Sequence, residues 1–171
     1  MRVLGVDPGT VRTGWGVIEC EGRRLRYVDS GVIVAGRGEV GKRLAAVYSG
    51  LRDVIARLDP SVLSLERNFL ARNVQSAFRL GEARGVAMAA AAAADVTLCE
   101  YTPATIKKSV VGHGRADKAD VQSAVIRLLM LVARPREDEA DALAAAACHG
   151  VCRGFESRLA VALEAAATRR R

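Results

Sequence analysis

Two short apolar segments of this chain each end in a carboxylate, and such residues are candidates for chemistry. Residues 3–6 lead into Asp7, which a Pro-Gly pair follows, and residues 61–65 lead into Glu66. Short apolar runs bounded by turn residues are typical of buried strands. A charge at the end of a buried strand is costly unless a partner compensates it. The simpler role for Asp7 is to open an Asx turn, and that alternative stays open on this motif alone.

Two further acids, Asp138 and Asp141, stand three residues apart on a helix expected to begin near Arg136. That spacing puts both on one helical face, although acids in a first turn also favour the helix dipole without any chemistry. A layered α/β fold would let this turn meet Asp7 and Glu66. Two like charges at 4 Å repel by ~4 kcal/mol at an effective dielectric of ~20. Either these acids lie apart, or a cation joins them.

Oxygen-only ligands favour hard ions such as Mg²⁺, with Mn²⁺ as a substitute. Two such ions about 3.5 to 4 Å apart activate a water and stabilise the leaving oxygen of an in-line displacement at phosphorus. The chain offers little for other hydrolytic chemistry, because it has two histidines and no G-x-S-x-G motif. The acids therefore favour phosphodiester hydrolysis.

The charge balance indicates a polyanionic partner. Lys and Arg number 26 against 19 Asp and Glu, giving a net charge of +7 and a pI near 9.7. Nucleic acid fits this balance, although a merely soluble basic protein has it too. The N-terminus lacks the sections of a signal peptide, and the longest apolar run, residues 86–94, is too short to cross a bilayer. We expect a cytoplasmic protein with no membrane segment.

The four cysteines are scattered without C-x-x-C spacing, which favours neither a zinc site nor a disulfide framework. Cys148 and Cys152, four apart on an expected helix, are better interpreted as small buried thiols.

Hydrophobic periodicity predicts one α/β domain in which three strands form an antiparallel meander before helices and strands alternate. Thr102 with Pro103, and Ala116 or Asp117, carry the signals of helix starts. Strands are expected at 3–7, 13–19, 25–35, 61–65 and 96–101, and helices at 40–58, at 73–94, from 103, at 117–129 and from about 136 to 148.

A rival interpretation comes from Gly36, Gly38 and Gly41, which spell G-x-G-x-x-G between a strand and a helix. Glu66 follows at roughly the distance at which a dinucleotide-binding fold keeps its ribose-binding acid. This alternative leaves Asp7 and the late carboxylates unexplained, and a plain surface turn accounts for the glycines.

Four collinear blocks of this sequence resemble the bacterial RuvC Holliday-junction resolvases. They are residues 5–10 (GVDPGT), 65–69 (LERNF) with 80–85 (LGEARG), 107–118, and 138–144 (DEADALA). The resemblance implies a ribonuclease H-like fold, with a five-stranded mixed sheet flanked by helices on both faces, acting as a homodimer. Residues 1–153 would form the nuclease domain, and residues 154–171 a basic tail or short helix.

The resemblance also implies roles for individual residues. Asp7, Glu66, Asp138 and Asp141 match the family's metal-binding catalytic acids. Lys107 and Lys118 match its basic residues near the scissile phosphate, and Phe69 matches the aromatic at the junction centre, unless it is a core residue. Further candidates for DNA contacts, each of which solvated surface also explains, are Arg67, Arg72, Arg79, Lys108 and Arg115.

The function expected from these residues is an Mg²⁺-dependent endonuclease, with two ions per site, that nicks opposed strands of a four-way DNA junction in recombination and repair. RuvA and RuvB would be its junction-binding and branch-migrating partners. Two alternatives remain open at this point. Actin-like and sugar-kinase ATPases begin with a similar turn but need a second lobe, and a junction-binding protein without activity would need no complete set of acids.

Overall fold

The fold is built on one five-stranded mixed sheet. The computed structural model describes residues 1–67 and 74–168, with side chains up to residue 154. The strands are β1 (Arg2–Asp7), β2 (Arg12–Glu21), β3 (Arg24–Val34), β4 (Val62–Glu66) and β5 (Thr97–Tyr101). Their order across the sheet is β3-β2-β1-β4-β5. The first three strands form an antiparallel meander, whereas β1, β4 and β5 run parallel.

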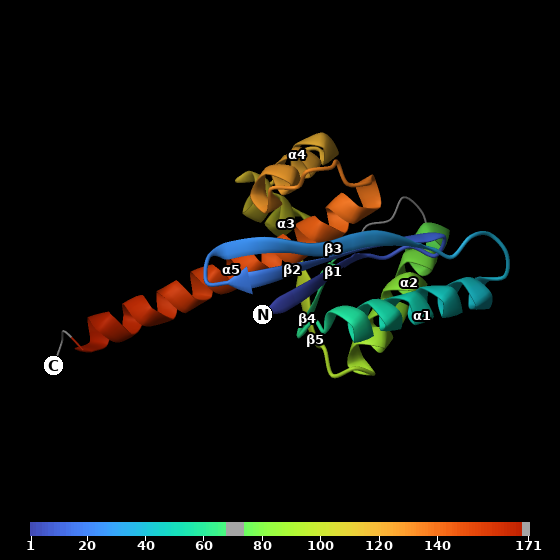
Figure 1. Ribbon diagram of the computed structural model, residues 1–171, viewed down its shortest axis with the longest axis horizontal. Helices are drawn as coiled ribbons and strands as arrows, with labels where there is room; N and C mark the ends of the chain where they lie inside the picture. Colours follow the sequence, from blue (N-terminus) through green and yellow to red (C-terminus); the bar gives the residue numbers. More distant parts are fainter. Residues whose placement is uncertain (68–73, 169–171) are drawn as a thin grey trace.

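Helices cover both faces of the sheet (Figure 1). They are α1 (Val40–Leu58), α2 (Val74–Ala92), α3 (Pro103–Val111), α4 (Lys118–Leu129) and α5 (Glu137–Thr168). Side chains alternate along a strand, so Leu4 of β1 packs with α1 and α2 while Val3 packs with α3, α4 and α5. This arrangement confirms the predicted five-stranded mixed sheet flanked by helices on both faces.

The starts of α3 and α4 follow the predicted capping signals. Thr102 accepts a hydrogen bond from the backbone N–H of Thr105 at 3.1 Å, and Pro103 takes the first helical position. Asp117 accepts from the N–H of Asp120 at 2.8 Å, and the Asp120 side chain accepts in return, which forms a capping box. These caps fix the two short helices that carry Lys107 and Lys118.

A glycine seam lets α5 lie directly on β1 and β2. The seam consists of Gly5 of β1 and of Gly14 and Gly16 of β2. Gly5 pairs with Gly16 across the two strands, and Gly14 pairs with Asp7. A Cβ added to Gly5 would lie 1.9 Å from the backbone oxygen of Ala142, and one on Gly14 would lie 2.0 Å from that of Asp138. No side chain fits there, so the seam sets how closely the first turns of α5 approach the sheet. The facing residues of the helix, 142–148, are all buried.

The G-x-G-x-x-G segment is a surface turn, and the dinucleotide alternative is wrong. Gly36 and Gly38 have φ of 74° and 126° in the connection from β3 to α1. Dinucleotide-binding glycines follow a parallel strand in a doubly wound sheet, whereas β3 is an antiparallel strand at the sheet edge.

The last helix is longer than expected, because α5 continues to Thr168 and crosses the predicted boundary at residue 153 (Figure 1). The division of the chain into a nuclease domain and an appended tail stays a prediction. None of the described helices is long and apolar enough to cross a membrane.

Candidate active site

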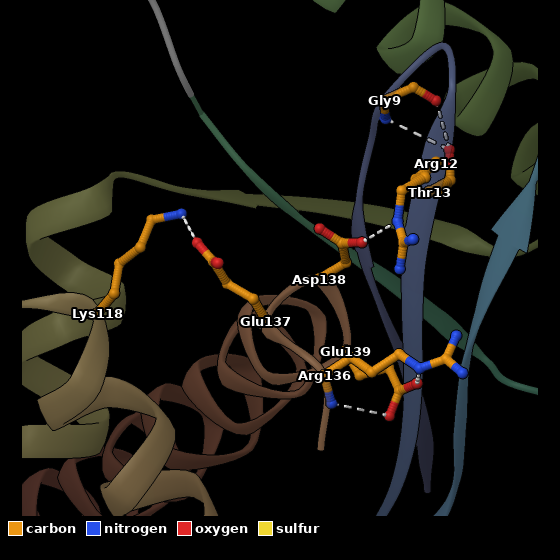
Figure 2. Close-up of polar contacts among 8 residues, drawn as sticks. All are labelled: Gly9, Arg12, Thr13, Lys118, Arg136, Glu137, Asp138 and Glu139. Atoms are coloured by element: carbon orange, nitrogen blue, oxygen red, sulfur yellow. Dashed lines mark hydrogen bonds and ion pairs between the residues drawn. The ribbon is translucent and has the colours of Figure 1, made fainter. Parts of the chain in front are cut away.

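Asp7 and Glu66 come together because their strands are parallel neighbours. β1 and β4 pair with Val6 opposite Leu65, so the acids that follow leave the sheet side by side at its carboxyl edge. The turn after Asp7 is braced by Thr13, a buried residue whose hydroxyl donates to the Gly9 carbonyl at 2.7 Å and accepts from the Gly9 N–H at 3.3 Å (Figure 2). Asp7 is therefore held at the end of the strand rather than in a free loop.

The first turn of α5 adds the other two acids. The seam brings the backbone of Asp138 against Gly14, directly beside the end of β1, and Asp141 follows one turn later. Their side chains are 31% and 30% exposed, so both remain accessible from solvent. The positive end of the helix dipole favours anions here. All four predicted acids thus belong to one cluster, contributed by β1, β4 and α5.

Electrostatics shows how strongly these carboxylates act on one another. Burial, and then the charges of Asp141, Asp138 and Glu66, raise the pKa of Asp7 to about 7. Burial and the charge of Asp141 also raise the pKa of Glu66. The pKa of Asp141 is raised chiefly by burial, against the opposing charge of Lys118. Such shifts arise where like charges share a desolvated site.

The donor chemistry of the cluster fits a hard divalent cation, since every donor is a carboxylate oxygen and the group repels itself. Among the described residues, however, no three His, Cys, Asp or Glu side chains are placed to hold a metal ion as they stand. Both acids of the helix are paired with cations of the protein: Asp138 with Arg12 at 2.8 Å, and Asp141 with the Lys118 ammonium at 3.8 Å.

Both predicted lysines lie beside the acids. Lys118 is the first residue of α4, where the helix dipole disfavours a cation. It pairs with Glu137 (Figure 2) and also with Asp141. Lys107 of α3 lowers the pKa of both Glu66 and Asp141 by its charge, although burial outweighs it in each case. A cleft of about 360 Å³, lined by Lys118 and Asp141 among others, adjoins this side of the cluster.

The predicted DNA-contacting residues are spread more widely. Arg67 directly follows Glu66 and is exposed, as are Lys108 on α3 and Arg115 in the connection to α4. Arg79 is exposed on α2, a helix that carries none of the four acids. Phe69 and Arg72 lie outside the described residues. The roles of all these residues in DNA binding stay predictions.

Comparison with known proteins is consistent with this geometry. The family described as "Crossover junction endodeoxyribonuclease RuvC" matches residues 3–149. The chain belongs to the RuvC family. It is similar to the RuvC of Acinetobacter baumannii, 45% identical over 93% of this chain and 88% of that protein. It is also 48% identical to the RuvC of Shewanella amazonensis, over 86% of this chain and 85% of that protein.

A solved RuvC structure has the same fold. The Thermus thermophilus protein in complex with a Holliday junction superposes with a TM-score of 0.85 at 30% identity, covering 91% of this chain and 96% of that one. This similarity confirms the ribonuclease H-like fold. The RuvC match contains the four acids and both lysines, and it ends at residue 149, so residues 150–168 of α5 lie beyond it.

Sequence reasoning missed several residues that shape this RuvC site. Arg12 pairs with Asp138, and Glu137 pairs with Lys118. Arg84 of α2 donates to the Glu66 carbonyl and pairs with Glu100 of β5. The glycine seam was missed as well, although glycine at alternating positions of one strand facing an alanine-rich helix signals a close helix–sheet contact.

Proposed function

We propose that this chain is a metal-dependent endodeoxyribonuclease that cuts four-way DNA junctions. One observation carries the proposal: Asp7 lies at the carboxyl end of the central strand β1, where burial and three further carboxylates raise its pKa to about 7. Gathering carboxylates in a buried site lowers the stability of the fold unless a cation compensates their charge. Relatives named as crossover junction endodeoxyribonucleases, and a relative bound to a Holliday junction, supply the reaction class and the substrate.

In this proposal Asp7, Glu66, Asp138 and Asp141 hold two Mg²⁺ ions, for which Mn²⁺ can substitute. When bound, the ions supply an activated water and stabilise the leaving oxygen of the phosphodiester. Asp7 and Glu66 are fixed by their strands, while Asp138 and Asp141 swing in from the helix. Lys107 and Lys118 place positive charge beside the carboxylates, where they neutralise charge that develops on the phosphate.

The substrate would be selected by shape more than by sequence, since phosphate contacts position a protein without reading bases. A net charge of +7 favours the DNA backbone in general. Arg67, which directly follows Glu66, is exposed, as are Lys108 and Arg115, and all three are suited to this contact. The same proposal includes action in recombination and repair in the cytoplasm, with RuvA and RuvB as partners.

A homodimer would give two active sites for two opposed strands, because a C2 dimer matches a junction of near two-fold symmetry. One face of α2 is open to receive a second copy. Val74 and Phe78 on it are 72% and 69% exposed, and Cβ atoms on Gly81 and Gly85 would meet nothing within 4 Å. These four residues share a helical face, and small residues there allow two backbones to approach closely.

The test uses a labelled synthetic four-way junction and a linear duplex of the same sequence. Wild-type protein should cut the junction symmetrically in Mg²⁺, leave the duplex intact and stop in chelator. Asp7→Asn should still bind the junction while losing at least about a hundredfold in cleavage rate, as loss of a ligating carboxylate implies. Cleavage that continues in chelator would contradict the proposal, and binding without cleavage by wild type would indicate a non-catalytic junction-binding protein.

A further inference from the structure

Arg12 is a cation that neither the predicted site nor the glycine seam explains. It is the first residue of β2, beyond the turn that follows Asp7, and its Nε donates to Asp138 Oδ2 at 2.8 Å (Figure 2). The guanidinium is 47% exposed and the carboxylate 31%. The acid it pairs with is the one that begins the helical half of the cluster.

This pair is well suited to exchange. Ion pairs between exposed side chains are weak, because solvent screens them and two side chains must be held in place. A hard dication such as Mg²⁺ binds one or two carboxylate oxygens directly while it keeps several waters, and its charge is twice that of the guanidinium and far more concentrated. The Arg12 side chain is long, and among the described residues Asp138 is the one carboxylate with which it forms an ion pair.

The other cation at the cluster behaves differently. Lys118 lies between Glu137 and Asp141 and is shared by them. If Asp141 turns toward a metal, Lys118 keeps Glu137. If Asp138 turns inward, Arg12 loses its carboxylate partner, and the positive charge of Arg12 is left unpaired at the rim of the site. Lys118 therefore keeps a carboxylate partner when the acids bind a metal, whereas Arg12 loses its partner.

Resting on the proposed function, we infer that Arg12 is an exchange residue: it neutralises Asp138 in the metal-free protein, is displaced when a divalent cation takes that carboxylate, and then binds the DNA backbone. Arg12 would thereby set the metal concentration at which the site fills, and would couple filling of the site to engagement of the junction.

The first test measures metal binding without DNA, by following free Mn²⁺ with electron paramagnetic resonance during titration of the protein. Arg12→Gln should bind Mn²⁺ about two- to fivefold more tightly than wild type, because the competing ion pair is gone. Arg12→Lys, which keeps the charge, should bind Mn²⁺ more like wild type. Arg26→Gln, which breaks the exposed Arg26–Glu19 pair at the far end of the sheet, is the matched control and should not change the affinity.

The second test measures junction binding against salt concentration, in chelator and in Ca²⁺, with the same samples checked for cleavage. In Ca²⁺ the plot of log K against log salt should be less steep for Arg12→Gln by about 0.9, the loss of one phosphate contact. In chelator the two slopes should coincide, because Arg12 is then held by Asp138. Thermal unfolding of each variant shows that the fold is retained.

Three results would overturn the inference. These are equal Mn²⁺ affinity in wild type and Arg12→Gln, an equal loss of slope with and without Ca²⁺, and no loss of slope in either condition. Each leaves the nuclease proposal standing as long as wild type binds Mn²⁺. A wild-type protein that binds no Mn²⁺ would instead remove the proposed function and the exchange role together, so the two failures are distinguishable.

Discussion

The two ends of the central sheet treat their acidic side chains in opposite ways. At one end Glu19 of β2 accepts a hydrogen bond from Arg26 of β3, and this bond lowers the pKa of Glu19. At the other end Asp7 lies among carboxylates that, together with burial, raise its pKa to about 7. The register that pairs Arg2 with Glu19 and Gly14 with Asp7 separates the two ends by the length of β1.

This difference distinguishes the end of the sheet whose acid is neutralised within the fold from the end whose acids call for an external ligand. A paired surface acid is satisfied by the protein itself. A crowded, desolvated one is satisfied only when something from outside joins it. The structure holds this unfavourable arrangement rigidly, through the parallel pairing of β1 with β4 and through the glycine seam. Each prediction below disturbs one end or its support.

The largest effect is expected from Gly5→Ala, because its Cβ would lie 1.9 Å from the Ala142 oxygen and 2.7 Å from the Ala146 nitrogen. These are backbone atoms of α5, which cannot yield as a flexible side chain would, so the helix must move away from the sheet. We expect a loss of about 3 kcal/mol or more in the free energy of unfolding, at the upper end of overpacking costs. Urea denaturation measures it.

The control for this prediction is Gly41→Ala in α1, where the nearest atom to the new Cβ is the Glu39 carboxylate at 3.7 Å. Alanine is the better helix former, so this variant should gain about 0.5 to 1 kcal/mol. It also tests the glycine motif, because a dinucleotide-binding loop would not accept a side chain there. Equal effects at both glycines would show that the seam does not support the site.

Asp7→Asn should stabilise the metal-free protein. The folded state raises the pKa of Asp7 from 3.8 to about 7, so the folded protein holds this proton more tightly than the unfolded chain. The contribution of Asp7 to stability is therefore complete below about pH 4 and is lost as the pH rises to about 7. At about 1.4 kcal/mol per pKa unit the loss in the free energy of unfolding would be between about 4 and 5 kcal/mol, and coupling to the other acids reduces it to about 2 to 4 kcal/mol.

The measurement is denaturant unfolding between pH 4 and pH 8 in chelator. Asp7→Asn should show a flatter pH dependence than wild type, and saturating Mg²⁺ should narrow the gap because the ion stabilises only wild type strongly. Asp53→Asn, at an exposed position of α1, is the control and should leave the pH dependence unchanged. A wild type as stable at pH 8 as at pH 5 would show that the acids do not strain the fold.

Arg84→Gln should have an intermediate effect. Arg84 is only 16% exposed, and it joins the carbonyl of Glu66 to the side chain of Glu100. Loss of hydrogen bonds from a charged donor costs about 1.5 to 3 kcal/mol. Because the bond is made to Glu66, a proposed metal ligand, junction cleavage should also fall severalfold through misplacement of its carboxylate.

Arg52→Gln separates these two effects. Arg52 of α1 also donates to a backbone carbonyl, that of Ala93 at 2.6 Å. Neither residue belongs to a strand or helix that carries one of the four acids. The Arg52→Gln variant should lose stability and keep the wild-type cleavage rate. If both variants lower cleavage in proportion to their stability, Arg84 supports the fold alone and does not position Glu66.

Much of this organisation is predictable from the sequence. Short apolar runs gave the strands that end in Asp7 and Glu66, and the signals at Thr102 and Asp117 marked the true helix starts. The length of α5 was underestimated, because residues 149–159 contain two glycines and no alanine, and this weak local propensity does not end the helix.

The contacts that complete the site were not predictable in the same way. Arg12 and Asp138 are 126 residues apart, and nothing local to either residue specifies the other. Their meeting depends on the angle at which α5 crosses the sheet, which the glycine seam sets through backbone contact. Strand ends are a local property of the chain, whereas side-chain pairing across layers is a property of the packed fold.

The smallest effect is expected at the satisfied end of the sheet. Arg26→Gln removes an ion pair between side chains that are 66% and 20% exposed, and such pairs contribute little. The urea midpoint at pH 7 should not change measurably, and neither should Mn²⁺ affinity or junction cleavage. The one expected change is local: the pKa of Glu19, followed by NMR titration, should rise toward its usual value because its main hydrogen-bond donor is gone. A large loss of stability would mean that both ends of the sheet depend on charge to the same degree, and the contrast between them would fail.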